Sequence, residues 1–134
     1  MRKNLWALVA LVIVLSLLLA ACAGPGAVAK DPAAAAVESY LAATVAKDTA
    51  RVSSLACKDW EQEALLEMDA FQAVTAELTN VSCKNSGADG SATLVACTGS
   101  ITTTYNGEKQ SLDLSRQTYK VVQEGGDYRV CGYK

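Results

Sequence analysis

Hydrophobic and polar positions divide the chain into three stretches with different periodicities. Residues 5–21 are almost uninterruptedly apolar, with Ser16 as their single polar residue. From residue 32 to about residue 68, apolar residues recur every three or four positions, which is the spacing of one helix face. From about residue 71 onward, short alternations of apolar and polar residues are typical of strands. The body of the chain is therefore predicted to contain helices first and strands second.

The helical stretch contains three helices, predicted at about residues 32–46, 49–56 and 60–68. Each has a candidate N-cap, namely Asp31, Asp48 and Asp59, because a carboxylate accepts hydrogen bonds from the first free backbone N–H groups of a helix. Pro32 suits the first helical position. The first helix is predicted to bury one stripe of residues: Ala33, Ala36, Val37, Tyr40, Leu41, Thr44 and Val45.

The strand stretch is predicted to form an antiparallel meander of four strands, at about residues 71–84, 92–105, 109–123 and 127–133. Asn106-Gly107 and Gly125-Gly126 are strong signals for two-residue hairpin turns. Counting outward from these turns predicts four cross-strand pairs: Ile101–Leu112, Gly99–Leu114, Val121–Val130 and Tyr119–Gly132. On the predicted third strand, Leu112 and Leu114 have even numbers, whereas Tyr119 and Val121 have odd ones. Both pairs can lie on the same apolar face only if the strand contains a bulge, which is predicted near Arg116.

Four cysteines in this body are predicted to form two disulfides. A hairpin centred on Gly90 pairs residues whose numbers sum to 180, so Cys83 faces Cys97 at a distance that suits a disulfide. Cys57 is then left to join the helical part to the last strand at Cys131. A zinc site of four cysteines is the competing interpretation, but the sequence contains no C-x-x-C pair.

The N-terminal apolar run has the flanks of a secretory signal peptide, with Arg2 and Lys3 before it and small residues at its end. Leu19-Ala20-Ala21-Cys22 resembles the lipobox of bacterial lipoproteins. The resemblance implies that lipid is attached to the Cys22 sulfur and that the chain is cleaved after Ala21. An uncleaved transmembrane helix is the alternative, since 17 residues lie at the lower end of the spanning range.

Both interpretations predict a membrane-attached, extracytoplasmic protein. The domain prediction is a signal peptide at residues 1–21, a flexible tether at 22–31 and one folded domain at 32–134. Membrane lipid is the expected partner of the acylated Cys22. An oxidising compartment also agrees with two disulfides in a domain of about a hundred residues.

Composition removes several classes of function. The chain has 134 residues and a formal net charge of −2, and residues 22–134 alone carry 10 basic and 14 acidic residues, a net charge of −4. A mildly acidic domain argues against nucleic acid as a partner. The sequence has no histidine, which removes the usual general base near neutral pH and the commonest metal ligand. We therefore predict no catalytic residues, no metal and no cofactor.

Three helices followed by an antiparallel meander indicate an α+β fold. The body resembles the nuclear-transport-factor-2-like group, or cystatin-like roll, as found in small bacterial envelope lipoproteins. The resemblance rests on the alanine-rich helix Pro32–Ala46, which ends in Ala46-Lys47-Asp48, and on the closing hairpin Gly125-Gly-Asp-Tyr-Arg-Val-Cys-Gly132. It implies three N-terminal helices packed on a curved four-stranded antiparallel sheet. The chain departs from the enzymes of this group because it lacks histidine.

The resemblance also implies a cone-shaped cavity under the sheet. The bulky residues that could line it are Tyr40, Trp60, Phe71, Tyr105, Tyr119 and Tyr128. Simple core packing is the alternative and is favoured here, because a small domain needs its large side chains for burial. Asp113 and Arg116 are the charged residues expected nearest the mouth of the cavity, although a surface ion pair would also account for them.

The predicted third helix carries a run of carboxylates: Glu61, Glu63, Glu67 and Asp69. A cation site is one interpretation of this run. A solvated helix face is the favoured one, because such charge runs usually serve solubility.

The sequence thus predicts a non-enzymatic binding or accessory module of the cell envelope, whose partner is an envelope protein or a small apolar ligand. The alternatives are a small isomerase or cyclase that uses the cavity, and a structural lipoprotein without a pocket. The sequence contains no nucleophile motif such as G-x-S-x-G. An apolar cavity open to solvent would favour the binding module over the structural lipoprotein.

Overall fold

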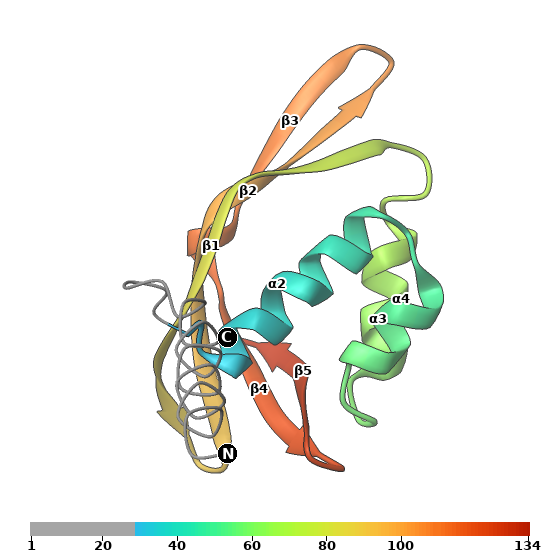
Figure 1. Ribbon diagram of the computed structural model, residues 1–134. Coiled ribbons are helices and arrows are strands. Elements are labelled where there is room, and N and C mark those ends of the chain that lie inside the picture. Colours follow the sequence, from blue (N-terminus) through green and yellow to red (C-terminus); the bar gives the residue numbers. More distant parts are fainter. Residues whose placement is uncertain (1–28) are drawn as a thin grey trace, which may run out of the picture.

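The computed structural model describes residues 29–134, and the predicted signal peptide and Cys22 lie outside this range. The described chain has the predicted α+β class (Figure 1). Its elements in order are α2 (Pro32–Val45), α3 (Thr49–Leu55), α4 (Glu61–Asp69), β1 (Thr75–Asp89), β2 (Ala92–Tyr105), β3 (Glu108–Asp113), the 3-10 turn η1 (Leu114–Arg116), β4 (Thr118–Glu124) and β5 (Asp127–Tyr133). Within residues 29–134, no helix has the length and apolar character needed to cross a membrane.

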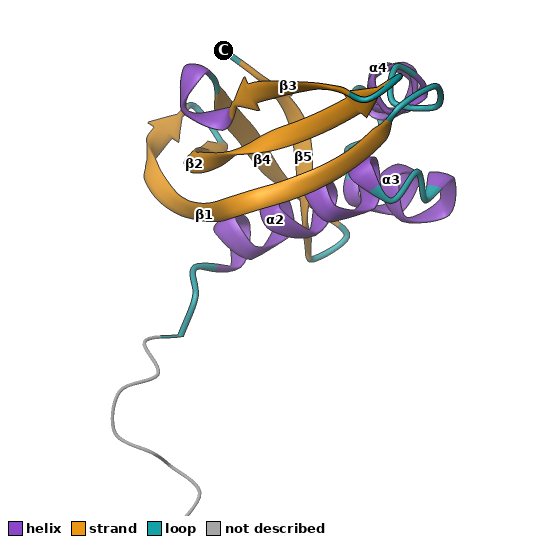
Figure 2. Cartoon of the chain, turned by 90° about the horizontal axis from the view of Figure 1, so that it is seen from above, coloured by secondary structure: helices purple, strands orange, loops and turns teal. Residues whose placement is uncertain are grey.

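The helices and the sheet form two layers. Helix α2 crosses one face of the sheet, and α3 and α4 pack beside its C-terminal end (Figures 1 and 2). The predicted stripe of α2 is buried apart from Val45, which is half-buried, and Ala34 and Ala43 are buried in addition. The strongly buried valines Val37, Val52, Val95, Val121 and Val130 come from both layers and form the centre of the core.

Two of the three predicted N-caps are present. The Asp31 carboxylate accepts hydrogen bonds from the backbone N–H groups of Ala33 and Ala34, at 2.9 and 3.1 Å. The Asp48 carboxylate accepts one from Arg51 at 3.1 Å. The prediction for Asp59 is wrong, because α4 starts one residue later, at a Trp60 cap that makes no side-chain hydrogen bond.

The sheet has five strands instead of the predicted four. Strand β2 is the long central strand and pairs with β1 along one edge. Along its other edge, residues 93–96 pair with β4 and residues 100–105 pair with β3. The predicted third strand is therefore two strands, and the predicted bulge near Arg116 is the 3-10 turn η1. After pairing with residues 100–105 of β2 as strand β3, the chain passes through η1 and pairs with residues 93–96 as strand β4. A single bulge would not achieve this change of partner segment.

The predicted register holds near the hairpin turns. Ile101 lies opposite Leu112, and Val121 lies opposite Val130. Two predictions are wrong. Leu114 belongs to η1 and does not pair with Gly99, and a register shift between Tyr119 and Val121 places Tyr119 opposite Tyr133 instead of Gly132.

Strand β1 starts and ends four to five residues later than predicted, at Thr75 and Asp89. Its hairpin with β2 closes in a tight turn, and pairs next to the turn have numbers that sum to 181. A bulge between Asn85 and Gly87 then changes the sum to 180, so Cys83 pairs with Cys97 as predicted.

Both disulfides have the predicted pairing. Cys83–Cys97 joins two facing strand residues with a Cα–Cα distance of 4.1 Å, and Cys57–Cys131 joins the end of the α3 segment to β5 at 5.1 Å. The backbone supports the second bridge, because the N–H of Cys57 donates to the carbonyl oxygen of Val130 at 2.8 Å. The helical layer is thus attached to the last strand by a covalent bond and a short parallel backbone contact.

Candidate functional site

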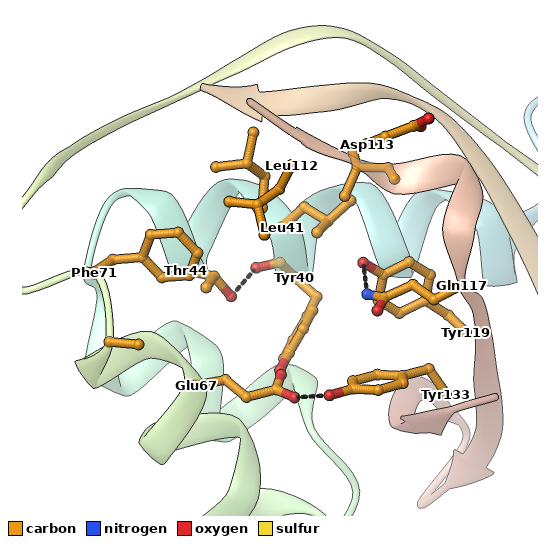
Figure 3. A pocket seen from close by; sticks show the side chains of 13 residues that line it. Tyr40, Leu41, Thr44, Glu67, Phe71, Leu112, Asp113, Gln117, Tyr119 and Tyr133 are labelled. Carbon is orange, nitrogen blue, oxygen red and sulfur yellow. Dashed lines mark hydrogen bonds between the residues drawn. The ribbon is translucent and has the colours of Figure 1, made fainter. Parts of the chain in front are cut away.

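A cavity of about 250 Å³ lies between α2, the end of α4 and the strands β2 to β5 (Figure 3). Its apolar wall is formed by Leu41, Phe71, Ile101, Leu112 and Leu114. Ile101 and Leu114 are buried, while Leu112 is 52% exposed and forms part of the rim. The cavity is therefore apolar inside and open to solvent.

The polar end of the cavity is built around the Glu67 carboxylate. Tyr133 donates its hydroxyl hydrogen bond to Glu67 Oε1 at 2.6 Å, and Tyr40 donates to Oε2 at 3.3 Å (Figure 3). Tyr40 comes from α2, Glu67 from α4 and Tyr133 from the end of β5. The three groups thus join the helical layer to the last strand at one end of the cavity.

The pKa values of these tyrosines reflect their surroundings. Burial raises the pKa of Tyr40 well above its usual range; the negative charge of Glu67 adds to this, and the neighbouring Trp60 indole partly offsets it. The hydrogen bond to Glu67 raises the pKa of Tyr133 to about 12. Both hydroxyls consequently keep their protons at neutral pH and remain hydrogen-bond donors.

A second polar pair lies beside Tyr133 (Figure 3). Gln117 donates from Nε2 to the Tyr119 hydroxyl at 2.8 Å. Burial also raises the pKa of Tyr119. The ring of Tyr133 packs edge-on against Tyr119 and against Trp60, with ring centroids 6.3 and 5.6 Å apart. These contacts hold Tyr133 in place although 43% of this residue is exposed.

Three of the six predicted cavity residues line this cavity, namely Tyr40, Phe71 and Tyr119. Trp60 is half-buried behind Tyr133 and packs on the backbone of Gly132. The other two lie elsewhere. Tyr105 is 57% exposed at the end of β2, and Tyr128 lines a separate surface groove between α2 and β5.

Asp113 lies at the cavity wall as predicted, but its carboxylate forms a hydrogen bond within its own chain segment. It accepts a hydrogen bond from the backbone N–H of Ser115 at 2.9 Å and so caps η1, and this bond lowers the pKa of Asp113. Figure 3 shows the carboxylate directed away from the cavity. Arg116 does not line the cavity. Within residues 29–134, no ion pair forms between Asp113 and Arg116.

Glu67 and Tyr133 are the site residues that the sequence interpretation missed. Glu67 was assigned to a solvated acidic face, together with Glu61, Glu63 and Asp69. The sequence does indicate that Glu67 shares a helix face with apolar residues. The i, i+3, i+4, i+7 spacing of one face is followed by Ala64, Glu67, Met68 and Phe71. The sequence contains no corresponding signal for Tyr133. Its position opposite Tyr119 results from the register shift between Tyr119 and Val121.

The acidic residues do not form a metal site in the part of the chain that the structure describes. Among residues 29–134, no three Cys, Asp or Glu side chains come close enough together to hold a metal ion. Among the carboxylates of α4, Glu67 is the one that lines the cavity and accepts hydrogen bonds from the two tyrosines. What the cavity offers is a single carboxylate with fixed donors at the edge of an apolar space.

Comparison with known proteins bears on the fold. No protein-family model matches the chain, and no curated protein matches it. The fold is similar to the solution structure of a SEC-C motif containing protein from Rhodopseudomonas palustris, with a TM-score of 0.50 and 13% sequence identity. The similarity covers 78% of this chain and 80% of that chain, and at this identity it shows a shared α+β fold alone.

Proposed function

We propose that this protein is a lipid-anchored, extracytoplasmic binding module of the cell envelope. In this proposal a cystatin-like roll holds a small, largely apolar ligand in the cavity between α2 and the sheet. The observation that carries the proposal is the cavity itself, which is open to solvent, apolar inside and equipped with the Glu67 carboxylate at one end. A structural lipoprotein has no need of such a cavity, which leaves a buried wall without packing partners.

The anchor part of the proposal rests on the lipobox-like motif that ends at Cys22. Two disulfides in the described domain support it, because structural disulfides persist in oxidising compartments outside the cytoplasm. Two acyl chains suffice for stable attachment to a bilayer. The tether at 22–31 spans at most about 35 Å when fully extended, which would keep the domain near the membrane surface.

Binding is proposed in place of catalysis because of the polar groups in the cavity. General acid–base catalysis works best with groups whose pKa lies near the operating pH. Tyr40, Tyr119 and Tyr133 all have raised pKa values, so they hold their protons tightly at neutral pH. The hydroxyls of Tyr40 and Tyr133 already donate to Glu67. This arrangement favours a fixed recognition group over a proton shuttle.

A blocked cavity tests the proposed function. Leu112 lines the cavity at its rim, while its neighbour Ser111 is exposed and, as the next residue of strand β3, points to the opposite face. Leu112→Trp should fill the entrance and weaken the binding of six-carbon apolar compounds at least about tenfold, and Ser111→Trp should leave it unchanged. The measurement is calorimetric titration of the full chain in lipid nanodiscs with 1-hexanol, n-hexylammonium and hexanoate. Absence of binding by all three compounds would contradict the proposed function.

A further inference from the structure

We propose that the cavity selects organic cations, namely protonated amines or quaternary ammonium compounds that carry a short apolar group. This inference rests on the proposed binding function and specifies the class of ligand. The geometry that points to it combines one unpaired carboxylate, a set of aromatic rings around the same space and a lining free of basic side chains.

The charges around the cavity favour a cationic ligand. Of the residues in 29–134 that line the cavity, none is a lysine or arginine, and Glu67 forms no ion pair within this part of the chain. Its two hydrogen-bond partners are neutral hydroxyls. A partly buried carboxylate without a cation favours a ligand that supplies the missing positive charge. Anionic ligands would be repelled by the same group.

The Glu67 carboxylate also has hydrogen-bonding positions left for a ligand. An ionised carboxylate offers about four acceptor positions on its two oxygens. Tyr133 uses one position on Oε1 and Tyr40 uses one on Oε2. Each oxygen of Glu67 therefore keeps a free acceptor position for an N–H donor. Because the tyrosines hold the carboxylate at the cavity edge, an ammonium group would meet an acceptor that is already oriented.

Aromatic rings in the lining add a further attraction for a cation. Tyr40, Phe71, Tyr119 and Tyr133 all line the cavity, and Figure 3 shows Phe71 on one side of Tyr40 and the other two tyrosines on the other side. A cation within about 6 Å of an aromatic face is attracted by the negative face of the ring. The rings also present an apolar surface, so they tolerate methyl groups on nitrogen that would block hydrogen bonding. The combination of rings with one carboxylate suits an ammonium ligand better than a neutral alcohol.

The size of the cavity limits the apolar group of the ligand. A volume of about 250 Å³ lies just below the ~300–1,000 Å³ of pockets that hold drug-sized ligands. The ligand part inside the cavity is thus a short group. With the ammonium at Glu67, an alkyl chain of about six carbons would lie against Leu41, Ile101 and Leu114, which form the apolar wall.

Three probes of matched length test the inference on the full chain in zwitterionic lipid nanodiscs: n-hexylammonium, 1-hexanol and hexanoate. Calorimetric titration should show that n-hexylammonium binds at least about tenfold more tightly than 1-hexanol, with hexanoate weakest. Glu67→Gln should remove this preference by weakening n-hexylammonium binding about tenfold while changing 1-hexanol binding less than twofold. Glu63→Gln is the matched control, because it removes the same charge one turn earlier on α4, from an exposed side chain outside the cavity.

The outcomes separate this inference from the proposed function. If 1-hexanol or hexanoate binds as tightly as n-hexylammonium, cation selection is wrong while the binding function stands. If Glu63→Gln weakens n-hexylammonium as much as Glu67→Gln does, the preference arises from general charge attraction and the assigned site is wrong. If none of the three probes binds, both proposals fail. The comparison of probes on the unchanged chain does not depend on the folding of any variant.

Discussion

At the scale of single residues, the buried tyrosines link the candidate site to the stability of the domain. The pKa of Tyr40 is raised above its usual value of about 10 in the folded chain, mainly because the side chain is buried. Below pH 10 both the folded and the unfolded states hold the proton, so this contribution to stability is fully present. As the pH rises above 10, the unfolded chain loses the proton first and stability falls.

The prediction is an alkaline loss of stability that depends on Tyr40. The free energy of unfolding should fall by about 1.4 kcal/mol per pH unit above pH 10 for each such tyrosine. Tyr40→Phe should lower the slope by that amount, and the exposed Tyr105→Phe should not. Urea unfolding at pH 8, 9, 10 and 11 measures the slope. Equal slopes for the wild-type chain and Tyr40→Phe would show that the Tyr40 hydroxyl does not carry this effect.

A second prediction concerns Gly99, which lies in β2 next to the irregular pairing after Thr79. Its φ is +92°, and a Cβ atom there would lie 2.5 Å from the carbonyl oxygen of Asn80 and 2.6 Å from that of Thr79. Backbone would have to move, so Gly99→Ala should destabilise the domain by at least about 2 kcal/mol. In the Asn106-Gly107 turn, Gly107 has a φ of +82° but a Cβ there would meet no described atom within 4 Å.

Gly107→Ala is therefore the control for Gly99→Ala. It carries the left-handed backbone strain, which costs about 1 kcal/mol, without the close contact. Urea unfolding of the two variants gives the difference directly. Similar losses for both would mean that the contact across the β1–β2 pair can relax and that backbone conformation alone matters.

At the scale of elements, the two disulfides are expected to differ in their effect. Cys57–Cys131 closes a loop of 74 residues and Cys83–Cys97 one of 14. The chain-entropy model assigns about 4.5 kcal/mol to the first and about 3 kcal/mol to the second. The first also attaches the helical layer to β5, while the second lies within one hairpin.

Paired serine variants test this difference. Cys57→Ser with Cys131→Ser should lower the free energy of unfolding by about 1.5 kcal/mol more than Cys83→Ser with Cys97→Ser. Hydrogen exchange should show increased opening of α3 and α4 in the first variant and of the β1–β2 hairpin in the second. A larger loss from the hairpin pair would mean that strand packing at Cys83 outweighs the entropy of the long loop.

At the scale of the whole molecule, the proposed anchor makes a prediction about release from the membrane. After Cys22 the first site for trypsin is Lys30, which precedes Asp31 at the start of the folded domain and has a 46% exposed side chain. Brief trypsin treatment of membrane-bound protein should release a disulfide-linked fragment that begins at Asp31. Mass spectrometry should find the acyl mass on a residual peptide of residues 22–30.

Cys22→Ser is the matching control for the anchor. The proposal expects this variant to retain residues 1–21 and to carry no acyl group. A wild-type chain that keeps Met1 and has no added acyl mass would contradict the lipoprotein proposal. That outcome would leave the cavity and its ligand preference to be judged by their own titrations.

The order of the helices and strands, two of the helix caps and both disulfide pairings could be predicted from the sequence. Most of these features depend on local chemistry or on short counts from a turn, whereas Cys57 was paired with Cys131 by elimination once Cys83 and Cys97 had been paired. A carboxylate before Pro32 caps a helix wherever that helix later packs, and Asn106-Gly107 sets the register of its own hairpin. Cys83 and Cys97 could be paired because they lie only a few residues from the turn at Gly90.

The split of the predicted third strand and the composition of the candidate site depend instead on contacts between distant segments of the chain. The 3-10 turn η1 exists because β3 and β4 pair with different halves of β2, a relation that no single stretch of sequence contains. In the sequence, Glu67 is one of several acidic residues of a helix. It becomes a site residue because α2 and β5 bring Tyr40 and Tyr133 to it from 27 and 66 residues away in the chain.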